Sequence, residues 1–517
     1  MSTSGTRDYG AAVAALNTLQ SNFSIVDAIR KSGKGMNKQA IPEMIEWCRK
    51  IGYEPSDFDK LRPIHVAGTK GKGSTSAFVS SILAQYLPHP DATTPTKIGL
   101  YTSPHLRYVR ERIQINNEPI SEEKFAEYFY CVWDRLEAAA KDSNATSDMP
   151  TKPVYFRYLT LVALHAYLAE SVDTAVIECG IGGEYDSTNI LVEPTVTAIT
   201  SLGIDHVAML GSTLPEIAWH KAGVFKSGSV AFTAPQPEMA LQVLRDRAYE
   251  KGTTLHVVDT HPSLVKDEIK LGLSASFQKI NASLAIAVAA AHLRTLGFTS
   301  VPDPTASEHI PLPVEFIRGL EQVRWPGRCE VRRERNVMWH IDGGHTLESI
   351  EMTGNWFAGQ MASFYTGKSD HKGLPRILIF NQQTRDASAL ATALHKALRN
   401  GITTSSSEPP FTHVLFTTNQ TFSAGYKPDL VSMNTNQQDV DSLAVQTALA
   451  KTWSEIDAHA KVHVVKTIEE AIIRARNIAR DWVGNTDSEE ATVMALITGS
   501  LHLAGGAIEV LECEKEA

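Results

Sequence analysis

A glycine-rich stretch at Pro63–Ser76, PIHVAGTKGKGSTS, holds residues whose types and spacing suit phosphate chemistry. The apolar run Ile64–Ala67 has the pattern of a buried strand, and Thr75–Leu87 has the pattern of a helix. A glycine-rich loop between a strand and a helix can cradle a phosphate, because amides at the helix start point at the anion. Lys72 adds a positive charge, and the Ser74 hydroxyl can face a metal ion or a phosphate oxygen. We predict a phosphate-binding loop here; the alternative is a flexible, lysine-rich turn.

A carboxylate follows a second buried strand, in the stretch Asp173–Ile190, DTAVIECGIGGEYDSTNI. Ala175–Ile177 has the pattern of the strand, and Glu178 stands at its end, before three glycines. Ligands of open α/β sheets bind beyond the carboxyl ends of the strands, and Mg²⁺ prefers carboxylate oxygens. We predict that Glu178 holds magnesium beside the phosphate loop; the alternative is that it only caps a turn.

Two further strand ends carry polar groups. A strand predicted at Pro194–Gly203 leads to Asp205 and His206, and the helix expected at Thr213–Phe225 contains Lys221. The strand predicted at Ile98–Tyr101 is followed by four groups that are or can become cationic, namely His105, Arg107, Arg110 and Arg112. This basic cluster is either a solvated edge or the attraction for an anionic ligand.

These groups must be positioned by a large α/β protein. The chain has 517 residues, which is too many for one ordinary core, so we expect two domains. Strands and helices alternate on both sides of WPGR (325–328), and we place the boundary there. The predicted fold is α/β: a P-loop-type ATPase domain with a mostly parallel sheet at 1–325, then a smaller Rossmann-like domain at 326–517. Surface loops are expected at Pro88–Thr96, Ser405–Pro410 and Asn419–Asp439.

Composition narrows the class of protein. Hydrophobic residues make up 43% and charged residues 21%, which is typical of a folded globular chain. The formal net charge of −9 argues against general affinity for nucleic acid. No apolar run approaches a membrane span. The five scattered cysteines contain no CxxC and predict a reducing compartment, so we expect the cytoplasm; the N-terminus gives poor support for a mitochondrial presequence.

Together these motifs resemble the folylpolyglutamate synthases, a family of the Mur-ligase superfamily, over nearly the whole chain. The matching segments, in order, are GTKGKGS (68–74), YTSPHL (101–106), ECGIGGEYDSTN (178–189), GIDHVAMLG (203–211), HKAGVFK (220–226), FQKINASLA (277–285), WPGR (325–328), DGGHT (342–346) and TGSLHLAG (498–505). One residue departs from the family pattern: Lys70 stands where bacterial relatives often carry asparagine.

The resemblance implies an ATP-dependent ligase that adds L-glutamate to the γ-carboxyl of a folate or folylpolyglutamate. ATP phosphorylates the carboxylate, and the amine of glutamate attacks the resulting acyl phosphate. This activity retains folates and supports one-carbon metabolism. The implied partners are small molecules only, namely folate, L-glutamate and ATP, and we expect a monomer. Phosphoryl transfer needs positioning and charge neutralisation more than covalent help, which suits these residues.

The family pattern also implies roles for residues of the first domain. The residues implied to hold the ATP phosphates are Gly71, Lys72, Gly73 and Ser74. The residues that resemble magnesium ligands are Ser103, Glu178 and His206, of which the histidine is the least usual ligand for a hard cation. Lys221 aligns with a lysine that is carbamylated in some relatives, where the new anion can bridge to a second Mg²⁺. The resemblance also leaves room for K⁺ or another monovalent cation. The implied catalytic set is Lys72, Glu178, His206 and Lys221.

In the second domain, Arg328 and Asp342 resemble nucleotide contacts, with Asp342 accepting from a ribose hydroxyl and Arg328 meeting phosphate charge. His345 and Ser500 are candidates for binding the incoming glutamate. If Arg328 and Asp342 meet ATP that the first domain holds, catalysis requires domain closure.

Three alternatives remain open at this stage. A dihydrofolate synthase or a bifunctional enzyme would share the ATP site and differ in the pterin acceptor. A cell-wall Mur ligase fits the motifs less well. A nucleotide-gated binding protein that has lost catalysis is disfavoured, because the phosphate loop, Glu178, His206, Lys221 and Asp342 occur together.

Overall fold

The structure is a computed structural model of the chain. It describes residues 6–20, 38–87, 95–142, 150–306, 311–365, 374–383, 386–401, 409–423, 442–484 and 492–513. Most of the surface loops predicted at 88–96, 405–410 and 419–439 therefore lie outside the described residues. Within the described residues, no helix is both long and apolar enough to span a bilayer.

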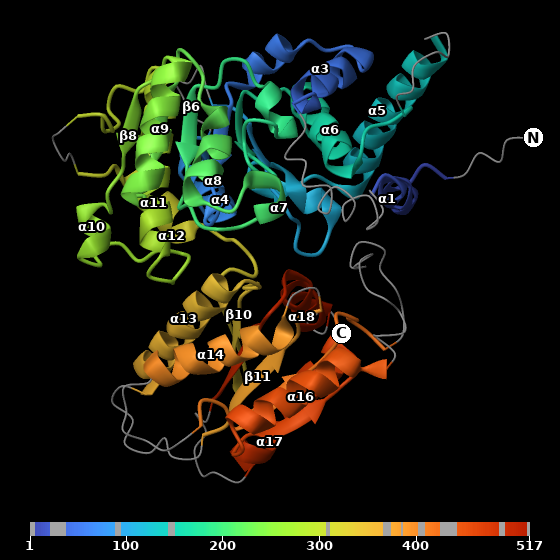
Figure 1. The fold of residues 1–517 in the computed structure, drawn as a ribbon, viewed down its shortest axis with the longest axis vertical. Coiled ribbons are helices and arrows are strands. Elements are labelled where there is room, and N and C mark those ends of the chain that lie inside the picture. The colour runs from blue at the N-terminus through green and yellow to red at the C-terminus, as the bar shows by residue number, and fades with distance from the viewer. Residues whose placement is uncertain are drawn as a thin grey trace, which may run out of the picture. The chain divides into compact units, whose positions relative to one another are not determined.

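The chain divides into two compact α/β units, and Figure 1 labels most of their helices and some of their strands. Unit 1 comprises Met1–His105, Val109–Gly272 and Phe277–Arg324. Unit 2 comprises Trp325–Ala517 together with two short segments from the first half of the chain, Leu106–Tyr108 and Leu273–Ser276.

Unit 1 is built on an eight-stranded sheet with the order β4-β3-β2-β5-β1-β6-β7-β8. The six strands from β2 to β8 in this order run parallel, and β3 and β4 add an antiparallel edge. The strands are β1 (Ile64–Ala67), β2 (Ile98–Tyr101), β3 (Ile113–Ile115), β4 (Glu118–Pro119), β5 (Thr174–Glu178), β6 (Val196–Ile199), β7 (Val230–Thr233) and β8 (Leu255–Val257).

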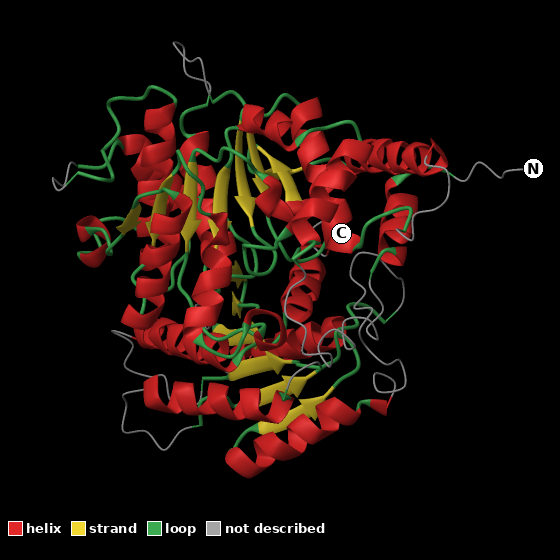
Figure 2. Cartoon of the chain, turned by 45° about the horizontal axis from the view of Figure 1, so that its top comes forward, coloured by secondary structure: helices red, strands yellow, loops and turns green. Residues whose placement is uncertain are grey.

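Helices cover both faces of this sheet, as Figure 2 shows. On one face α4 packs against both α11 and α12. Among the residues that the structure describes, the α-helices of unit 1 are α1 (Tyr9–Thr18), α3 (Ala40–Lys50), α4 (Lys72–Ala84), α5 (Glu122–Asp142), α6 (Tyr155–Ala169), α7 (Val207–Leu210), α8 (Leu214–Lys221), α9 (Glu238–Lys251), α10 (Pro262–Val265), α11 (Gln278–Thr295) and α12 (Val314–Gln322). Short 3-10 turns lie at Pro55–Leu61, Val109–Arg112, Ser187–Ile190 and Ala222–Val224.

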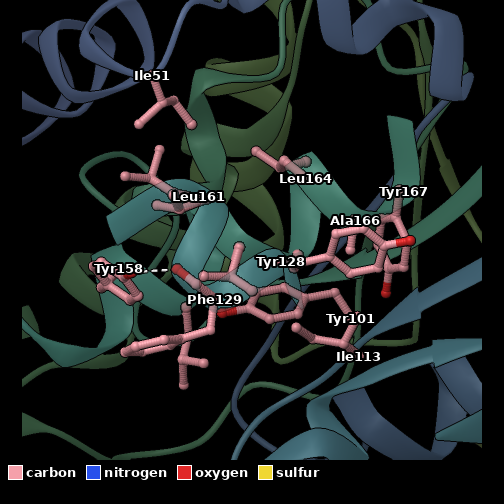
Figure 3. Packing of buried hydrophobic residues seen from close by; sticks show 14 of the residues in the cluster. Ile51, Tyr101, Ile113, Tyr128, Phe129, Tyr158, Leu161, Leu164, Ala166 and Tyr167 are labelled. Carbon is pink, nitrogen blue, oxygen red and sulfur yellow. Dashed lines mark hydrogen bonds between the residues drawn. The ribbon is translucent and has the colours of Figure 1, made fainter. Parts of the chain in front are cut away.

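Helices α1, α3, α5 and α6 form an aromatic-rich core against the β2–β5 side of the sheet (Figure 3). Phe129 is fully buried in this core, and its ring lies 5.1 Å from the ring of Tyr158, centroid to centroid. The Tyr158 hydroxyl donates to the Phe129 carbonyl oxygen at 2.8 Å, so burial leaves this polar group satisfied. His165 of α6 is also buried, and Tyr53 bonds to its Nδ1, as expected for a core histidine.

Unit 2 has a six-stranded sheet with the order β13-β12-β11-β14-β10-β9, parallel except for β9. Its strands are β9 (Glu330–Glu334), β10 (Val337–Ile341), β11 (Arg376–Phe380), β12 (His413–Phe416), β13 (Lys461–Val464) and β14 (Val493–Thr498). The helices in its described part are α13 (Leu347–Tyr365), α14 (Ala387–Gly401), α16 (Ala444–Ile456), α17 (Ile468–Gly484) and α18 (Leu501–Cys513). Helices α17 and α18 close one apolar core over the strands. The predicted α/β class, with two mostly parallel sheets, is confirmed.

Candidate active site

The ends of four adjacent parallel strands are level in unit 1, and the predicted site residues follow them. Val66 of β1 pairs with Glu178 of β5, Ala67 pairs with Ile199 of β6, and Tyr101 of β2 pairs with Ile177. The loops that leave β2, β5, β1 and β6 therefore start at one edge of the sheet. This is the edge where ligands of open α/β sheets bind.

The phosphate loop leaves β1 at this edge and enters α4. The helix begins at Lys72, three residues before the predicted start, with Gly71 as its N-cap. The predicted phosphate-binding residues after Gly71 thus form the first helical turn, where backbone amides have no partner inside the helix. The Ser74 hydroxyl is buried and accepts from the Gln278 side chain of α11 at 3.2 Å.

Two glycines of this loop are required by close packing. Gly68 has φ of 147° and Gly71 has φ of 87°, both in the region that favours glycine. A Cβ on Gly68 would lie 1.8 Å from Thr200 Oγ1, and one on Gly71 would lie 2.2 Å from Asn281 Oδ1. The chain therefore approaches its neighbours here as only glycine allows.

Glu178 and Ser103 lie together at the ends of β5 and β2. Glu178 is the last residue of β5 and only 3% of its surface is exposed. Its Oε2 accepts from the Ser103 backbone N–H at 3.0 Å. A buried carboxylate beside a hydroxyl-bearing residue gives oxygen donors of the kind that Mg²⁺ prefers.

His206 lies further along the loop that leaves β6. It is exposed, serves as the N-cap of α7, and has φ of 51°, a left-handed conformation unusual for a non-glycine residue. Its backbone N–H donates to Asp205 Oδ1 at 2.9 Å. Burial raises the pKa of Asp205, but the charges of Lys70 and His206 outweigh burial and hold it low, at about 2. The role of His206 as a metal ligand stays a prediction.

Lys221 lies under the phosphate loop. It ends α8, is 3% exposed, and its Nζ donates to the Gly68 carbonyl oxygen at 2.7 Å. Burial, followed by the nearby charge of Lys72, lowers the pKa of Lys221 to about 7. A substantial fraction of this amine is therefore uncharged at neutral pH.

Asp186 is a buried carboxylate whose role was not predicted from the sequence. Its oxygens accept from the Ile181 N–H at 2.9 Å and from the backbone and hydroxyl of Thr188 at 3.0 and 2.6 Å. Burial raises its pKa. Asp186 therefore fixes the glycine-rich loop that follows Glu178. The only signal in the sequence was that Asp186 follows those glycines within a few residues.

Gln278 and Asn281 of α11 were also missed as residues that support the phosphate loop. Gln278 reaches Ser74, and the Asn281 side-chain amide donates to Gln278 Oε1 at 2.8 Å. The signal available in the sequence was a pair of amide side chains at i and i+3 in an otherwise alanine-rich helix. The structure shows that both are buried.

In unit 2, Asp342 follows β10 and is largely buried. Its Oδ1 accepts from the Gly344 N–H at 2.9 Å and from the Thr353 hydroxyl at 2.6 Å, while Oδ2 accepts from the Cys329 N–H at 2.9 Å. The structure thus shows Asp342 tying together the loops around Arg328 and His345. Its contact with a ribose stays a prediction.

His345 and Ser500 lie at the ends of the neighbouring strands β10 and β14. His345 Nδ1 bonds to the Gly343 carbonyl oxygen at 2.9 Å. The Ser500 hydroxyl accepts from the His502 N–H at 3.1 Å and so caps the start of α18. Ser500 therefore has a structural role besides its predicted contact with glutamate.

The Arg328 guanidinium is within 3.4 Å of the Gly327 carbonyl oxygen.

The basic cluster after β2 engages protein groups. Arg112 donates to His105 Nδ1 at 2.9 Å, and Arg110 donates to the Ile120 carbonyl oxygen at 3.3 Å. Arg107 forms ion pairs with Glu509 and Glu512 of α18. These contacts favour a structural role for the cluster over the attraction of an anion.

Curated proteins of known name are similar to this chain over nearly its full length. A folylpolyglutamate synthase of Neurospora crassa is 46% identical over 513 residues, covering 98% of this chain and 92% of that protein. A folylpolyglutamate synthase of Saccharomyces cerevisiae is 45% identical over 514 residues, covering 98% of this chain and 87% of that protein. No family model matches the chain.

Solved structures share the fold. Mycobacterium tuberculosis folylpolyglutamate synthase, complexed with ADP and AMPPCP, superposes with a TM-score of 0.65 at 22% identity, covering 92% of this chain and 95% of that one. Escherichia coli FolC in complex with DHPP and ADP gives a TM-score of 0.65 at 21% identity, with full coverage of both chains.

Proposed function

We propose a role for each site residue from one premise: this chain belongs to the folylpolyglutamate synthase family. It is an enzyme, an ATP-dependent ligase that adds L-glutamate to the γ-carboxyl of folates and folylpolyglutamates. The level strand ends of unit 1 carry the proposal most directly, because they bring the phosphate loop beside Glu178. Activation and attack can then occur at one edge of the sheet.

In the proposed reaction, the folate γ-carboxylate attacks the γ-phosphorus of ATP and displaces ADP. The amine of glutamate then attacks the acyl phosphate carbon, and inorganic phosphate leaves from the tetrahedral intermediate as the amine loses its proton. The amides at the start of α4 and the Lys72 ammonium hold the phosphates in line. The chain contributes positioning and charge neutralisation rather than a covalent nucleophile.

Glu178 and Ser103 are the residues we propose to hold Mg²⁺, with His206 as a third ligand. The donors fit this ion, because a buried carboxylate and a hydroxyl are hard oxygen ligands, whereas the imidazole fits less well. When bound, Mg²⁺ neutralises charge on the ATP phosphates. Glu178 is oriented for this role by the Ser103 N–H. A site for K⁺ or another monovalent cation is compatible with the family but has no residue assigned to it.

Lys221 is proposed to be the residue that carbamylation would modify. Its lowered pKa supports this, because only the uncharged amine attacks CO₂. The N–C bond forms, one proton leaves the nitrogen, and the product is an anion that can hold a second Mg²⁺. Nuclear magnetic resonance of the protein in carbon-13-labelled bicarbonate should show a carbamate signal that Lys221→Met lacks. A spectrum identical for both proteins would remove the carbamylated form.

In unit 2, Arg328 and Asp342 are proposed to contact the phosphate and ribose of the nucleotide. His345 and Ser500 are proposed to bind the incoming glutamate. Their position at the carboxyl ends of β10 and β14 supports this, because ligands gather at such ends. Asp342→Asn should raise KM for ATP, and Ser500→Ala should raise KM for glutamate. Initial rates measured while each substrate is varied separately would test both expectations.

The acceptor is the part of the function that most needs an experiment. Glutamate incorporation should be measured with tetrahydrofolate, which carries one glutamate, with its polyglutamyl forms, and with dihydropteroate. We expect incorporation with the folates and none with dihydropteroate. Incorporation with dihydropteroate would instead favour the alternative, a dihydrofolate synthase or a bifunctional enzyme.

We also propose that the protein acts in the cytoplasm as a monomer on small-molecule substrates. Free cysteines, three of them buried, suit a reducing compartment. Light scattering coupled to gel filtration would test the monomer, and fluorescence microscopy of the tagged chain would test the compartment.

A further inference from the structure

The start of the phosphate loop is hydrogen-bonded to the loop that leaves β6. The backbone N–H groups of Thr69 and Lys70 both donate to the Ser201 carbonyl oxygen, at 3.1 and 3.0 Å. The Thr69 hydroxyl donates to the Gly203 carbonyl oxygen at 3.1 Å. The two loops therefore behave as one unit of structure at this edge of the sheet.

A half-buried ion pair continues this connection outward to His206. Lys70 Nζ lies 3.2 Å from Asp205 Oδ2, and the two side chains are 22% and 17% exposed. The other oxygen of the same carboxylate, Oδ1, accepts from the His206 N–H at 2.9 Å. One carboxylate thus links a side chain of the phosphate loop to the backbone of the histidine.

His206 needs such support because its backbone is unfavourable by itself. A φ of 51° is left-handed, and this conformation is unfavourable for a non-glycine residue unless its surroundings compensate. The bond from its N–H to Asp205 is a local compensation of this kind. If it is lost, the loop can relax and move the imidazole.

We propose that Lys70 and Asp205 are positioning residues, which fix His206 relative to the phosphate loop so that nucleotide and Mg²⁺ bind together. This inference rests on the proposed function of His206 as a metal ligand. Neither residue needs to touch the nucleotide. Residues that orient a metal ligand typically change metal affinity by 10- to 100-fold when they are replaced.

The test is calorimetric binding of a non-hydrolysable ATP analogue to the full chain, with Mg²⁺ titrated and with EDTA. Lys70→Met and Asp205→Ala should each weaken the Mg²⁺-dependent binding by about 10- to 100-fold and leave binding in EDTA unchanged. The double variant should lose no more than either single variant, because the two residues act through one contact. Lys70→Arg should restore most of the affinity.

Lys97→Met is the matched control. Lys97 also pairs with a carboxylate, that of Glu170 at 3.4 Å, but at the amino ends of β2 and β5, the opposite edge of the sheet. We expect wild-type binding from this variant. Thermal midpoints of all variants, compared with the control, show whether each has folded.

Three results would overturn the inference. Wild-type Mg²⁺ dependence in Asp205→Ala would remove the positioning role, and so would additive losses in the double variant. If Lys70→Met weakens binding of the ATP analogue as much in EDTA as with Mg²⁺, Lys70 contacts phosphate directly. His206→Ala separates the two levels of the argument. If His206→Ala leaves the Mg²⁺ dependence unchanged, His206 is not a metal ligand. If His206→Ala changes the Mg²⁺ dependence and Asp205→Ala does not, only the positioning role is removed.

Discussion

At the scale of single residues, Lys221 shows how burial prepares a side chain for chemistry. Its amine is held against the Gly68 carbonyl oxygen with little access to water, close to the charge of Lys72. Both effects disfavour the ammonium form. The same burial makes this lysine a source of pH-dependent stability, and that can be measured without substrate.

The pKa of Lys221 is lowered to about 7 in the folded chain, against an ordinary value of 10.5. Between these pH values the unfolded chain binds more protons at this group, so its contribution to the free energy of unfolding rises with pH. The slope is at most about 1.4 kcal/mol per pH unit. Chemical denaturation from pH 7 to 10 in bicarbonate-free buffer should show this rise in the wild type and a flatter profile in Lys221→Met. Parallel profiles would contradict an uncharged lysine here.

Lys72 and Glu178 allow the sharpest tests of catalysis at the residue scale. Lys72→Ala removes phosphate charge, and Glu178→Ala removes the carboxylate proposed for magnesium, so each should lower kcat by roughly 100- to 1,000-fold. The fold should persist, because neither change removes apolar packing. The measurement is ADP release with folate and glutamate at saturating ATP and Mg²⁺, with Lys97→Met as a control. Near-normal turnover in either variant would remove that assignment.

The sequence allowed these residues to be found because each lies within a few positions of a strand end. Glu178 follows an unbroken apolar run, and Lys72 stands among glycines, so local pattern was enough. Asp186, Lys70 and Gln278 could not be given roles in the same way. Their contacts reach Ile181, Asp205 and Ser74, and two of these three contacts join parts of the chain more than 100 residues apart.

At the scale of elements, the start of α4 controls the shape of the phosphate loop. Gly71 makes the turn into the helix with φ of 87°, and its α-carbon faces the side chain of Asn281. Asn281 is 5% exposed and is bonded to Gln278, so it has little freedom to move aside. The helix therefore cannot begin in this way with a larger residue.

Gly71→Ala should consequently destabilise the protein more than Gly228→Ala. Both glycines have positive φ, 87° and 82°, but a Cβ on Gly228 would meet nothing within 4 Å. Gly228→Ala should cost about 1–2 kcal/mol for the backbone alone, and Gly71→Ala about 1–3 kcal/mol more for overpacking. Thermal midpoints give the comparison, and only Gly71→Ala should also weaken binding of an ATP analogue. Equal midpoints would show that Asn281 yields without cost.

The element pattern was predictable where hydrophobic runs are long. β1 and β2 have the predicted bounds, whereas β6 is shorter than expected and α4 begins earlier. The prediction of α4 failed at its first turn because glycine and serine there oppose helix formation locally, while the loop's contacts with α11 impose it. The short pair β3 and β4 and the single turn α7 give too few residues for any periodicity to appear.

At the scale of the whole molecule, the chain has two cores and a proposed set of nucleotide contacts in each unit. If Arg328 and Asp342 meet ATP that the phosphate loop holds, the chain should become more compact when its ligands bind. Small-angle X-ray scattering should show a smaller radius of gyration with an ATP analogue plus folate than without ligands. The Lys72→Ala variant is the control, because it should bind nucleotide weakly and keep its radius. An unchanged wild-type radius would count strongly against closure.

The path of the chain also limits how the protein can be divided. Leu106–Tyr108 belongs to unit 2 although Ser103 and Glu178 belong to unit 1. Within unit 2, the Leu106 carbonyl oxygen packs against Gly505, where an added Cβ would lie only 2.2 Å from it. The Tyr108 hydroxyl donates to Glu509 at 2.6 Å. A fragment that begins near residue 325 would therefore lack the Leu106 backbone that packs against Gly505. It would also leave the buried Glu509 without its hydrogen bond from Tyr108. To express unit 2 as a separate protein, Leu106–Tyr108 would have to be restored beside α18.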